Sequence, residues 1–505
     1  MTDLFGGHPE TTHLSTAEVA FLDTTLRDGE QAPGVSLAPD EKAQIAQRLD
    51  SAGVEVIEAG SACTGAGERE TISRVTAQGL SATVTSFARG VQRDIDLAID
   101  CDVDGVNLVV PASDRHIERK VETTRASVID TTVELTEYAT DHGLWVEVLG
   151  EDGSRADLDF LEELMGQALA AGADRVCYCD TVGHATPDRT LEVVNRLTAL
   201  GPTSTHTHDD LGLAVTNALV SVAAGADLVH ATINGIGERA GNVALEEVAI
   251  ALAHGYDVET VATQELYELA QTVASATGIG LAPNKAVVGE NAFTHESGIH
   301  TDGTLKDDAM YEPYPPEQVG RERRLVLGKH AGRAGVRAAL AEHDVSVEED
   351  ELGRIVQRVK AIGDRGRRVT DADLLTIADD VRGTDRDRRV ELLDLTTTSG
   401  GPTPTASARL AVDDEERVAS GVGSGPVDAA VSAVREALAI DATLESYHVD
   451  AITGGTDALV TVEVTVSLGD RSVSVTGSDA DITRASVGAM VDAFDRLLVD
   501  TETAD

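Results

Sequence analysis

The stretch from Ser204 to Asp210 reads STHTHDD, and its last five residues, HTHDD, combine residue types that can do chemistry. It follows a Gly-Pro pair and begins with alternating small and polar residues, which predicts a short strand. Because residues i and i+2 of a strand point to the same face, His206 and His208 would present two imidazoles side by side. Imidazole is the commonest protein ligand for transition metals, so the two rings can share one ion. Without further context, two hydrogen-bonded or exposed histidines are the simpler interpretation.

A carboxylate far upstream in the sequence makes a metal site the better interpretation of the two histidines. Arg27 and Asp28 follow an apolar run that reads as a strand, and Asp28 offers a hard oxygen ligand that could join His206 and His208. Two histidines and one carboxylate leave positions open for a chelating substrate such as a 2-oxo acid. The ion would polarise the ketone, and Arg27 could stabilise the oxygen as it becomes an alkoxide. The alternative for Arg27 and Asp28 is a surface ion pair.

Strand-like and helical patterns alternate from Val19 to about His254 and make eight strand–helix units. The expected strands cover residues 19–23, 54–60, 82–87, 105–110, 144–149, 174–179, 203–207 and 227–233. Eight such units predict a (β/α)8 barrel, because a doubly wound open sheet has no reason to stop at eight. Polar side chains are expected at the C-terminal ends of these strands, where barrels build active sites. They are Asp23, Arg27, Asp28, Glu58, Asn107, Glu147, Glu151, Asp180, His206, His208 and Asn234.

The predicted architecture is α/β, with four parts. Residues 1–17 form a polar tail, 18–280 a TIM-barrel catalytic domain, 281–385 helical subdomains that complete the active site, and 386–505 an α+β regulatory or dimerisation domain. Helical patterns at 332–343 and 348–362 favour the third part, and a similar pattern at 260–277 precedes it. Strand-like runs at 390–397, 405–412, 458–467 and 472–476, with helical patterns at 426–439 and 482–499, favour the fourth. Residues 382–387 read as a linker.

Composition excludes several classes of protein. With 88 acidic and 40 basic residues the net charge is -48, so a nucleic-acid partner is not expected. No apolar run is long enough for a transmembrane helix, and no signal peptide is seen at the N-terminus. Four cysteines make no disulfide framework, which points to the cytoplasm; Cys177 and Cys179 read as small buried hydrophobes. The acid excess, spread over the chain, suggests a halophilic source.

Three motifs together resemble one family. The segment from Leu22 to Gln31 (LDTTLRDGEQ), the HTHDD stretch and the loop from Gly237 to Asn242 (GERAGN) are similar to the 2-isopropylmalate synthase family, which includes homocitrate and citramalate synthases. The similarity is greatest to its archaeal isopropylmalate and citramalate branch. It runs from about Val19 to Gly335 and, more loosely, through the C-terminal part. The barrel domain would then be of the pyruvate carboxyltransferase type.

The resemblance implies an acyltransferase that converts an acyl group into an alkyl group on transfer. Acetyl-CoA is enolised, its methyl carbon attacks a metal-bound 2-oxo acid, and the thioester is hydrolysed. The implied ligands of a divalent ion (Mg, Mn or Zn) are Asp28, His206 and His208, with Asn242 nearby or weaker. The implied catalytic residues are Arg27, Glu151, His300 and Tyr311, and the implied substrate contacts are Arg27, Asn107, Leu149 and Thr181.

Two positions depart from the family pattern. Leu149 stands where many members have Ser before the functional acid, and Asn107 stands where many have His on the fourth strand. Both positions line the family's 2-oxo acid pocket. Leu149 would fill space and Asn107 would open it, so the size of the acceptor does not follow from the sequence.

The resulting hypothesis is a homodimeric 2-isopropylmalate synthase that uses 2-oxoisovalerate, in leucine biosynthesis. The alternative is an (R)-citramalate synthase that uses pyruvate, in isoleucine biosynthesis. Homocitrate synthase, an aldolase-type lyase and a non-catalytic amino-acid sensor are less favoured. The segment from Gly421 to Ala430 resembles the start of the family's regulatory domain, so leucine or isoleucine is a candidate feedback inhibitor, with a purely structural dimerisation domain equally favoured.

Overall fold

The computed structural model describes residues 18–304, 306–307, 310–364, 369–382, 388–399, 403–413, 415–440, 442–451, 460–469, 471–479 and 481–499. They form two compact units, one of residues up to Phe293 with Tyr314–Arg323, the other of Thr294–Pro313 with the chain from Arg324 onward. The predicted tail over 1–17 and all but Arg382 of the predicted linker lie outside the described residues. The domain boundaries drawn from the sequence stay predictions.

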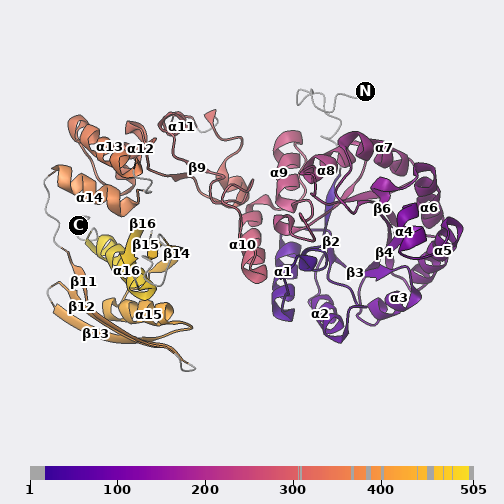
Figure 1. Cartoon of the computed structure of the whole chain (residues 1–505), viewed down its shortest axis with the longest axis horizontal. Helices are drawn as coiled ribbons and strands as arrows, with labels where there is room; N and C mark the ends of the chain where they lie inside the picture. The colour runs from indigo at the N-terminus through magenta and orange to yellow at the C-terminus, as the bar shows by residue number, and fades with distance from the viewer. Residues whose placement is uncertain are drawn as a thin grey trace. The chain divides into compact units, whose positions relative to one another are not determined.

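The first unit is built on a closed barrel of eight parallel strands, in which β8 pairs back on β1 (Figure 1). The strands are β1 (Ala20–Asp23), β2 (Val56–Glu58), β3 (Thr83–Arg89), β4 (Gly105–Pro111), β5 (Trp145–Glu151), β6 (Arg175–Asp180), β7 (Thr203–Thr207) and β8 (Leu228–Ala231). All eight expected strands are present. The closed barrel is confirmed, and the open sheet is excluded.

Helices cover the outside of this barrel (Figure 1). They are α1 (Pro39–Ser51), α2 (Ala66–Thr76), α3 (Gln92–Ile99), α5 (Arg125–Asp141), α6 (Leu158–Ala170), α7 (Pro187–Thr198), α8 (Ala214–Ala223), α9 (Leu245–Tyr256) and α10 (Leu266–Thr277). The short helix α4 (Asp114–Arg119) lies at the rim, next to the end of β5. Helix α7 shows why they form. Thr186 caps its first turn by accepting the Arg189 N–H, Pro187 occupies its first position, and Val193 and Leu197 bury its inner face.

The strand register corrects one prediction about the rim of the barrel. Asn107 and Glu147 are each the third residue of a seven-residue strand, they pair with each other across β4 and β5, and both are fully buried. They therefore lie inside the barrel and not at the C-terminal ends of the strands. Asn234 follows β8 in a short turn, and its amide donates to the Ala270 carbonyl at α10.

The second unit begins with a parallel pair of short strands, β9 (Thr294–His295) and β10 (Arg324–Leu325). Its helices are α11 (Gly298–Thr304), α12 (Arg333–Glu342), α13 (Glu349–Gly363) and α14 (Asp371–Arg382). Helices α12 and α13 match the sequence patterns, whereas α14 was not predicted. An apolar core that includes Val336, Leu340, Ile355 and Leu374 joins the last three helices.

The C-terminal part of this unit repeats one arrangement, three antiparallel strands followed by a helix. The first copy is β11 (Val390–Thr398), β12 (Thr405–Val412), β13 (Glu415–Val422) and α15 (Pro426–Leu438). The second is β14 (Thr443–Ala451), β15 (Val460–Leu468), β16 (Arg471–Asp479) and α16 (Ile482–Val499). This confirms the α+β prediction, although β13 and β14 were missed. Among the described residues, no helix is both long and apolar enough to span a membrane.

Candidate active site

Three predicted ligands meet at the C-terminal end of the barrel. His206 lies in β7, His208 follows that strand directly, and Asp28 lies in the turn after β1. The two Nε2 atoms are 3.3 Å apart, and Asp28 Oδ2 is 3.4 Å from His206 Nε2 and 3.8 Å from His208 Nε2. All three residues are at most 5% exposed. Strand alternation thus brings the two histidines together as expected, and barrel closure through β8 brings β1 to them.

This arrangement fits a metal ion. Ligand atoms about 2.1 Å from one ion lie about 3.0–3.4 Å from each other at octahedral or tetrahedral angles, close to the distances found here. Burial holds the pKa of His206 well below its usual value and lowers that of His208, so both rings are neutral. Burial alone would raise the pKa of Asp28, but Arg27 and the two histidines lower it to about 2. Neutral imidazoles beside an ionised carboxylate are the protonation states that metal binding requires.

The glycine-rich loop brings Asn242 to the same place. Asn242 is 3% exposed and forms a β-bridge with His208. Its Nδ2 donates to the Ile236 carbonyl, while its Oδ1 has no hydrogen-bond partner in the described part of the chain. Gly241 has φ +87°, and a Cβ there would lie on the Gly235 carbonyl oxygen, so the loop requires glycine. Asn242, predicted as a nearby or weaker ligand, thus lies beside His208 with its side chain buried.

Arg27 lies beside the ligand cluster and is fixed on three sides. Its Nε donates to Glu58 Oε2 at 2.6 Å, its NH1 donates to Asp28 Oδ2 at 3.0 Å, and its guanidinium stacks on Phe87 at 4.8 Å. Burial would lower the pKa of Arg27, but Glu58 and Asp28 raise it above its ordinary value. The result is a rigid, permanently charged donor next to the site where an oxyanion would form.

Below the ligand cluster, a layer of buried polar side chains crosses the barrel. Glu147 accepts hydrogen bonds from Asn107 Nδ2 at 2.6 Å and from the Ser204 hydroxyl, and its carboxylate oxygens lie 3.0 and 3.1 Å from His230 Nε2. The ring of His230 meets that of His206 edge-on at 5.6 Å. The amide Nδ2 of Asn107 is thus bonded to Glu147. The predicted contact between Asn107 and the acceptor would have to use Oδ1, which has no hydrogen-bond partner in the described part of the chain.

Leu149 lies in a small apolar cluster of its own. It packs with Cys177, Cys179 and Val109 from the neighbouring strands, and all but Val109 are buried. Both cysteines are buried, as the sequence predicted. Cys179 pairs in register with His206, so the cluster flanks the ligand group on the β5–β6 side. It would be an apolar wall for the side chain of an acceptor.

Glu151 and Thr181 lie at the ends of β5 and β6. Lys120 Nζ donates to Glu151 Oε1 at 2.5 Å, and His116 Nδ1 lies 3.2 Å from Oε2 without the alignment of a hydrogen bond. The Thr181 hydroxyl oxygen accepts the Asp152 N–H at 2.9 Å and keeps its own proton for donation. Both residues thus hold polar atoms at the rim of the barrel.

His300 and Tyr311 belong to the second unit. Their rings stack with centroids 4.3 Å apart and an angle of 29°. Nearby in the sequence, His295 Nε2 lies 3.0 Å from Glu312 Oε1. The structure therefore brings this predicted pair together within its own unit, as it does the group of Arg27 and the metal ligands in the first.

Sequence reasoning missed the supporting residues His116, Lys120, Ser204 and His230. For His230 a signal was present, because it alternates with Leu228 on a strand next to the HTH pattern. For His116 and Lys120 there was none, since each acts on a residue more than 30 positions away.

Asp23, at the end of β1, is a fully buried acid whose carboxylate accepts the Thr25 N–H at 2.8 Å and the Thr25 hydroxyl at 2.9 Å. Burial raises the pKa of Asp23 from 3.8 to about 7 against the effect of these bonds. The folded state therefore binds this proton more tightly than the unfolded state does. The contribution of Asp23 to the free energy of unfolding is therefore greatest at low pH. It falls by a few kcal/mol as the pH rises from 3.8 to about 7.

We expect Asp23→Asn to remove this pH dependence. The variant should gain thermal stability relative to the wild type as the pH rises from about 5 to about 8, because an amide needs no proton to remain neutral. Melting temperatures of both proteins at several pH values in that range measure the effect. A difference in melting temperature that stays constant across the range would contradict it.

Three family models together match most of the chain. The HMGL-like model matches residues 18–273, the model described as "Homocitrate synthase post-HMGL domain-like" matches 287–367, and the LeuA allosteric (dimerisation) domain matches 368–498. The first match covers the barrel and the candidate metal ligands. The last covers α14 and both copies of the C-terminal arrangement.

Similar proteins are found in archaea. A protein of Methanothermobacter thermautotrophicus, provisionally named (R)-citramalate synthase CimA, is 53% identical to this chain over 491 residues. The aligned region covers 96% of this chain and 99% of the relative. (R)-citramalate synthase CimA of Methanocaldococcus jannaschii is 47% identical over 95% and 99% of the two chains. The 2-isopropylmalate synthase of the same organism is 45% identical over 96% and 95%. The chain therefore belongs to the 2-isopropylmalate synthase and (R)-citramalate synthase family, and it is an acyltransferase of the type that converts acyl groups into alkyl groups on transfer.

Proposed function

We propose that the chain is an (R)-citramalate synthase, which joins acetyl-CoA, pyruvate and water into citramalate and CoA. The observation that carries the reaction type is the buried group of Asp28, His206 and His208 with Arg27 fixed beside it. The choice of pyruvate rests on the relatives, since those named citramalate synthase reach 53% and 47% identity and the 2-isopropylmalate synthase 45%. The sequence alone favoured 2-oxoisovalerate as the acceptor. We now propose pyruvate, and 2-oxoisovalerate becomes the second candidate.

Asp28, His206 and His208 would hold a divalent ion, with Asn242 Oδ1 as a further ligand. Bound there, Mg, Mn or Zn would act as a Lewis acid on the keto group of the acceptor. Arg27 donates hydrogen bonds to the keto oxygen and stabilises its negative charge as the new carbon–carbon bond forms. Glu58 and Phe87 keep the guanidinium in place, so that it does not have to reorganise during the reaction.

The other predicted residues are proposed to bind the acceptor and to transfer protons. The free proton of the Thr181 hydroxyl suits a hydrogen bond to the acceptor carboxylate. His300, stacked on Tyr311, is proposed as the base that takes a methyl proton from the thioester, a weak acid that requires a positioned base. Glu151, with Lys120 on one oxygen, is proposed as the acid–base group for hydrolysis of the thioester.

Leu149 should limit the size of the acceptor. We expect Leu149→Ala to raise kcat/KM for 2-oxoisovalerate relative to pyruvate by about tenfold or more, because the cluster with Cys179 and Val109 loses volume where the acceptor side chain would lie. Val148→Ala is the matched control, since Val148 is equally buried but packs into the main core of the unit. Equal acceptor ratios in the two variants would contradict this role.

We further propose a homodimer formed through the C-terminal part, with isoleucine or leucine as a feedback inhibitor. The match to an allosteric dimerisation domain supports both proposals. Large apolar side chains are exposed on its outer strands, Val418 and Val422 on β13 and Tyr447 on β14, and a second copy of the chain would cover such a surface. Sedimentation of the purified chain, and its activity at millimolar isoleucine and leucine, test the two parts separately.

Identification of the product tests the proposed reaction. The enzyme is incubated with Mg²⁺ or Mn²⁺, acetyl-CoA and pyruvate carrying a labelled methyl group, and the product is resolved by mass and on a chiral column. We expect (R)-citramalate together with an equal amount of free CoA. If free CoA formed without citramalate, the enzyme would only hydrolyse the thioester, and the proposal would be overturned.

A further inference from the structure

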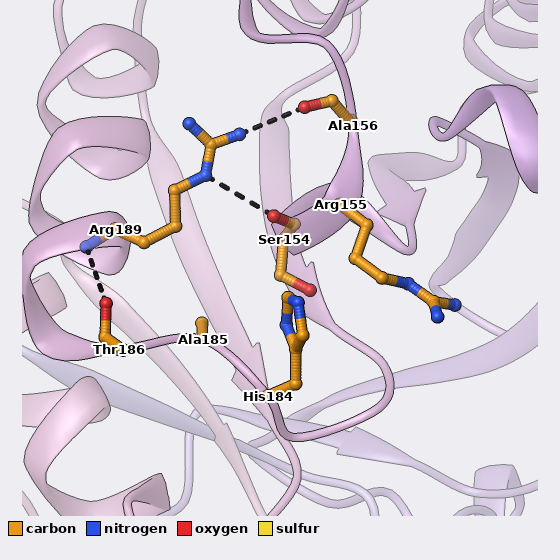
Figure 2. A pocket seen from close by; sticks show the side chains of 7 residues that line it. All are labelled: Ser154, Arg155, Ala156, His184, Ala185, Thr186 and Arg189. Atoms are coloured by element: carbon orange, nitrogen blue, oxygen red, sulfur yellow. Dashed lines mark hydrogen bonds between the residues drawn. The ribbon is translucent and has the colours of Figure 1, made fainter.

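A pocket of about 360 Å³ opens at the barrel rim, between the loops that follow β5 and β6 (Figure 2). Its lining is Ser154, Arg155, Ala156, His184, Ala185, Thr186 and Arg189. The volume lies within the range of small-ligand sites. Ser154 comes three residues after Glu151, and His184 three residues after Thr181, so the pocket adjoins the part of the rim where substrate is proposed to bind.

The charge of the lining is unusual for this protein. In a chain of net charge -48, three of the seven lining residues are Arg or His, and none of the seven is acidic. Arg155 Nε donates to Asp152 at 2.7 Å, and its terminal nitrogens have no bond to the part of the chain that the structure describes. His184 is half exposed, and Figure 2 shows its ring beside Ser154. A lining with cationic and no anionic side chains favours an anion over a cation, although Asp152 and Asp180 lie behind Arg155 and His184.

Two further features of the pocket favour an anionic ligand. Ser154 lines the pocket and is 3% exposed, and its Oγ has no hydrogen-bond partner in the described part of the chain. A buried hydroxyl in that state has its hydrogen-bonding capacity open to a group that enters the pocket. In addition, the pocket includes the start of the twelve-residue helix α7, where the helix dipole favours negative charge.

Arg189 supports the wall of the pocket. Figure 2 shows it folded across the loop, where Nε and NH2 donate to the carbonyl oxygens of Ser154 and Ala156 at 3.4 and 3.0 Å. NH1 bonds Glu192 at 3.0 Å. The loop after β5 is thereby tied to α7, so the pocket is formed before a ligand arrives.

We propose that this pocket binds a phosphate group of the coenzyme A thioester. The inference rests on the proposed function, which makes acetyl-CoA the acyl donor. Coenzyme A carries a 3′-phosphate and a diphosphate, and phosphate oxygens match the guanidinium, imidazole and hydroxyl donors of the pocket. The remote phosphate group would then contribute binding energy that holds the thioester near Glu151.

The test compares two acyl donors, acetyl-CoA and the acetyl thioester of N-acetylcysteamine, which has no phosphate. His184→Glu and Ser154→Ala should each lower the ratio of kcat/KM for acetyl-CoA to that for the phosphate-free donor, by about tenfold for the charge reversal. Because each protein serves as its own reference, partial misfolding does not alter the ratio. Arg196→Gln is the control: Arg196 is on the same helix but pairs with Asp159 and Glu162 outside the pocket.

Calorimetric titrations with CoA and with inorganic phosphate measure ligand binding directly. Weaker CoA binding in the two pocket variants supports the proposal, and unchanged CoA binding together with an unchanged donor ratio overturns it. Weaker phosphate binding with unchanged CoA binding would assign the pocket to a free anion and overturns it as well. If the wild type binds CoA at this pocket but releases none from acetyl-CoA with any 2-oxo acid, the proposed function fails and the pocket assignment stands.

Discussion

Asp28→Asn should lower kcat by about a thousandfold or more and should abolish tight binding of a divalent ion. Asp28 Oδ2 is the one carboxylate oxygen within 4 Å of both His206 Nε2 and His208 Nε2 in the described part of the chain. An amide has no charge to offset that of the cation, and one ligand atom of the three is weakened. The expected loss corresponds to about 4 kcal/mol of transition-state stabilisation. Metal content per chain and kcat, measured on the same preparation, test this directly.

Asp210→Asn is the matched control for this experiment. Asp210 is in the same HTHDD stretch, but its carboxylate pairs with Arg239 at 2.8 Å and is not in the ligand group. Loss of that partly exposed ion pair should change kcat only a few-fold. If Asp28→Asn kept its metal and its activity, the ligand assignment would be wrong.

Arg27→Gln is expected to have the second largest effect, a fall in kcat of about a hundredfold to a thousandfold with metal binding retained. The variant loses the cation that would face the developing alkoxide, while KM for the acceptor should change less because the ion and Thr181 still bind it. It also leaves the buried carboxylate of Glu58 without its charged partner, so thermal stability should fall. Steady-state kinetics at saturating metal separates the two effects.

Arg89→Gln tests the specificity of that result. Arg89 is also at the end of a barrel strand and pairs with a carboxylate, Asp94, but its side chain is 62% exposed. We expect kcat close to that of the wild type. A similar loss in both variants would show that the effect comes from charge on the barrel rim in general and not from contact with the acceptor.

The sequence contained enough information for the barrel and for its ligand group. Eight apolar runs separated by helical patterns define a closed barrel, and the alternation on β7 places His206 and His208 on one face. Asp28 was proposed as a carboxylate just past the first strand and from the family resemblance, and barrel closure places the end of β1 near the end of β7 through β8.

Other features depend on contacts that a sequence pattern does not contain. The depth of Asn107 and Glu147 in the barrel follows from strand register, so their predicted place at the rim was wrong. Strands β13 and β14 escaped prediction because their exposed residues obscure an alternating pattern, as in β13, which reads EERVASGV. The support of Glu151 by Lys120, and the basic pocket of Ser154 and His184, arise only when loops after different strands meet.

The reaction proposed for this enzyme is a metal-dependent condensation with pyruvate as the acceptor. The most direct measurement is kcat/KM for CoA release from acetyl-CoA with pyruvate and with 2-oxoisovalerate, in Mg²⁺ or Mn²⁺ and at a salt concentration where the acidic chain is folded. We predict a preference for pyruvate of at least about tenfold, which is about 1.4 kcal/mol, and no release after chelation of the metal. A preference for 2-oxoisovalerate would contradict the account and assign the chain to isopropylmalate synthesis.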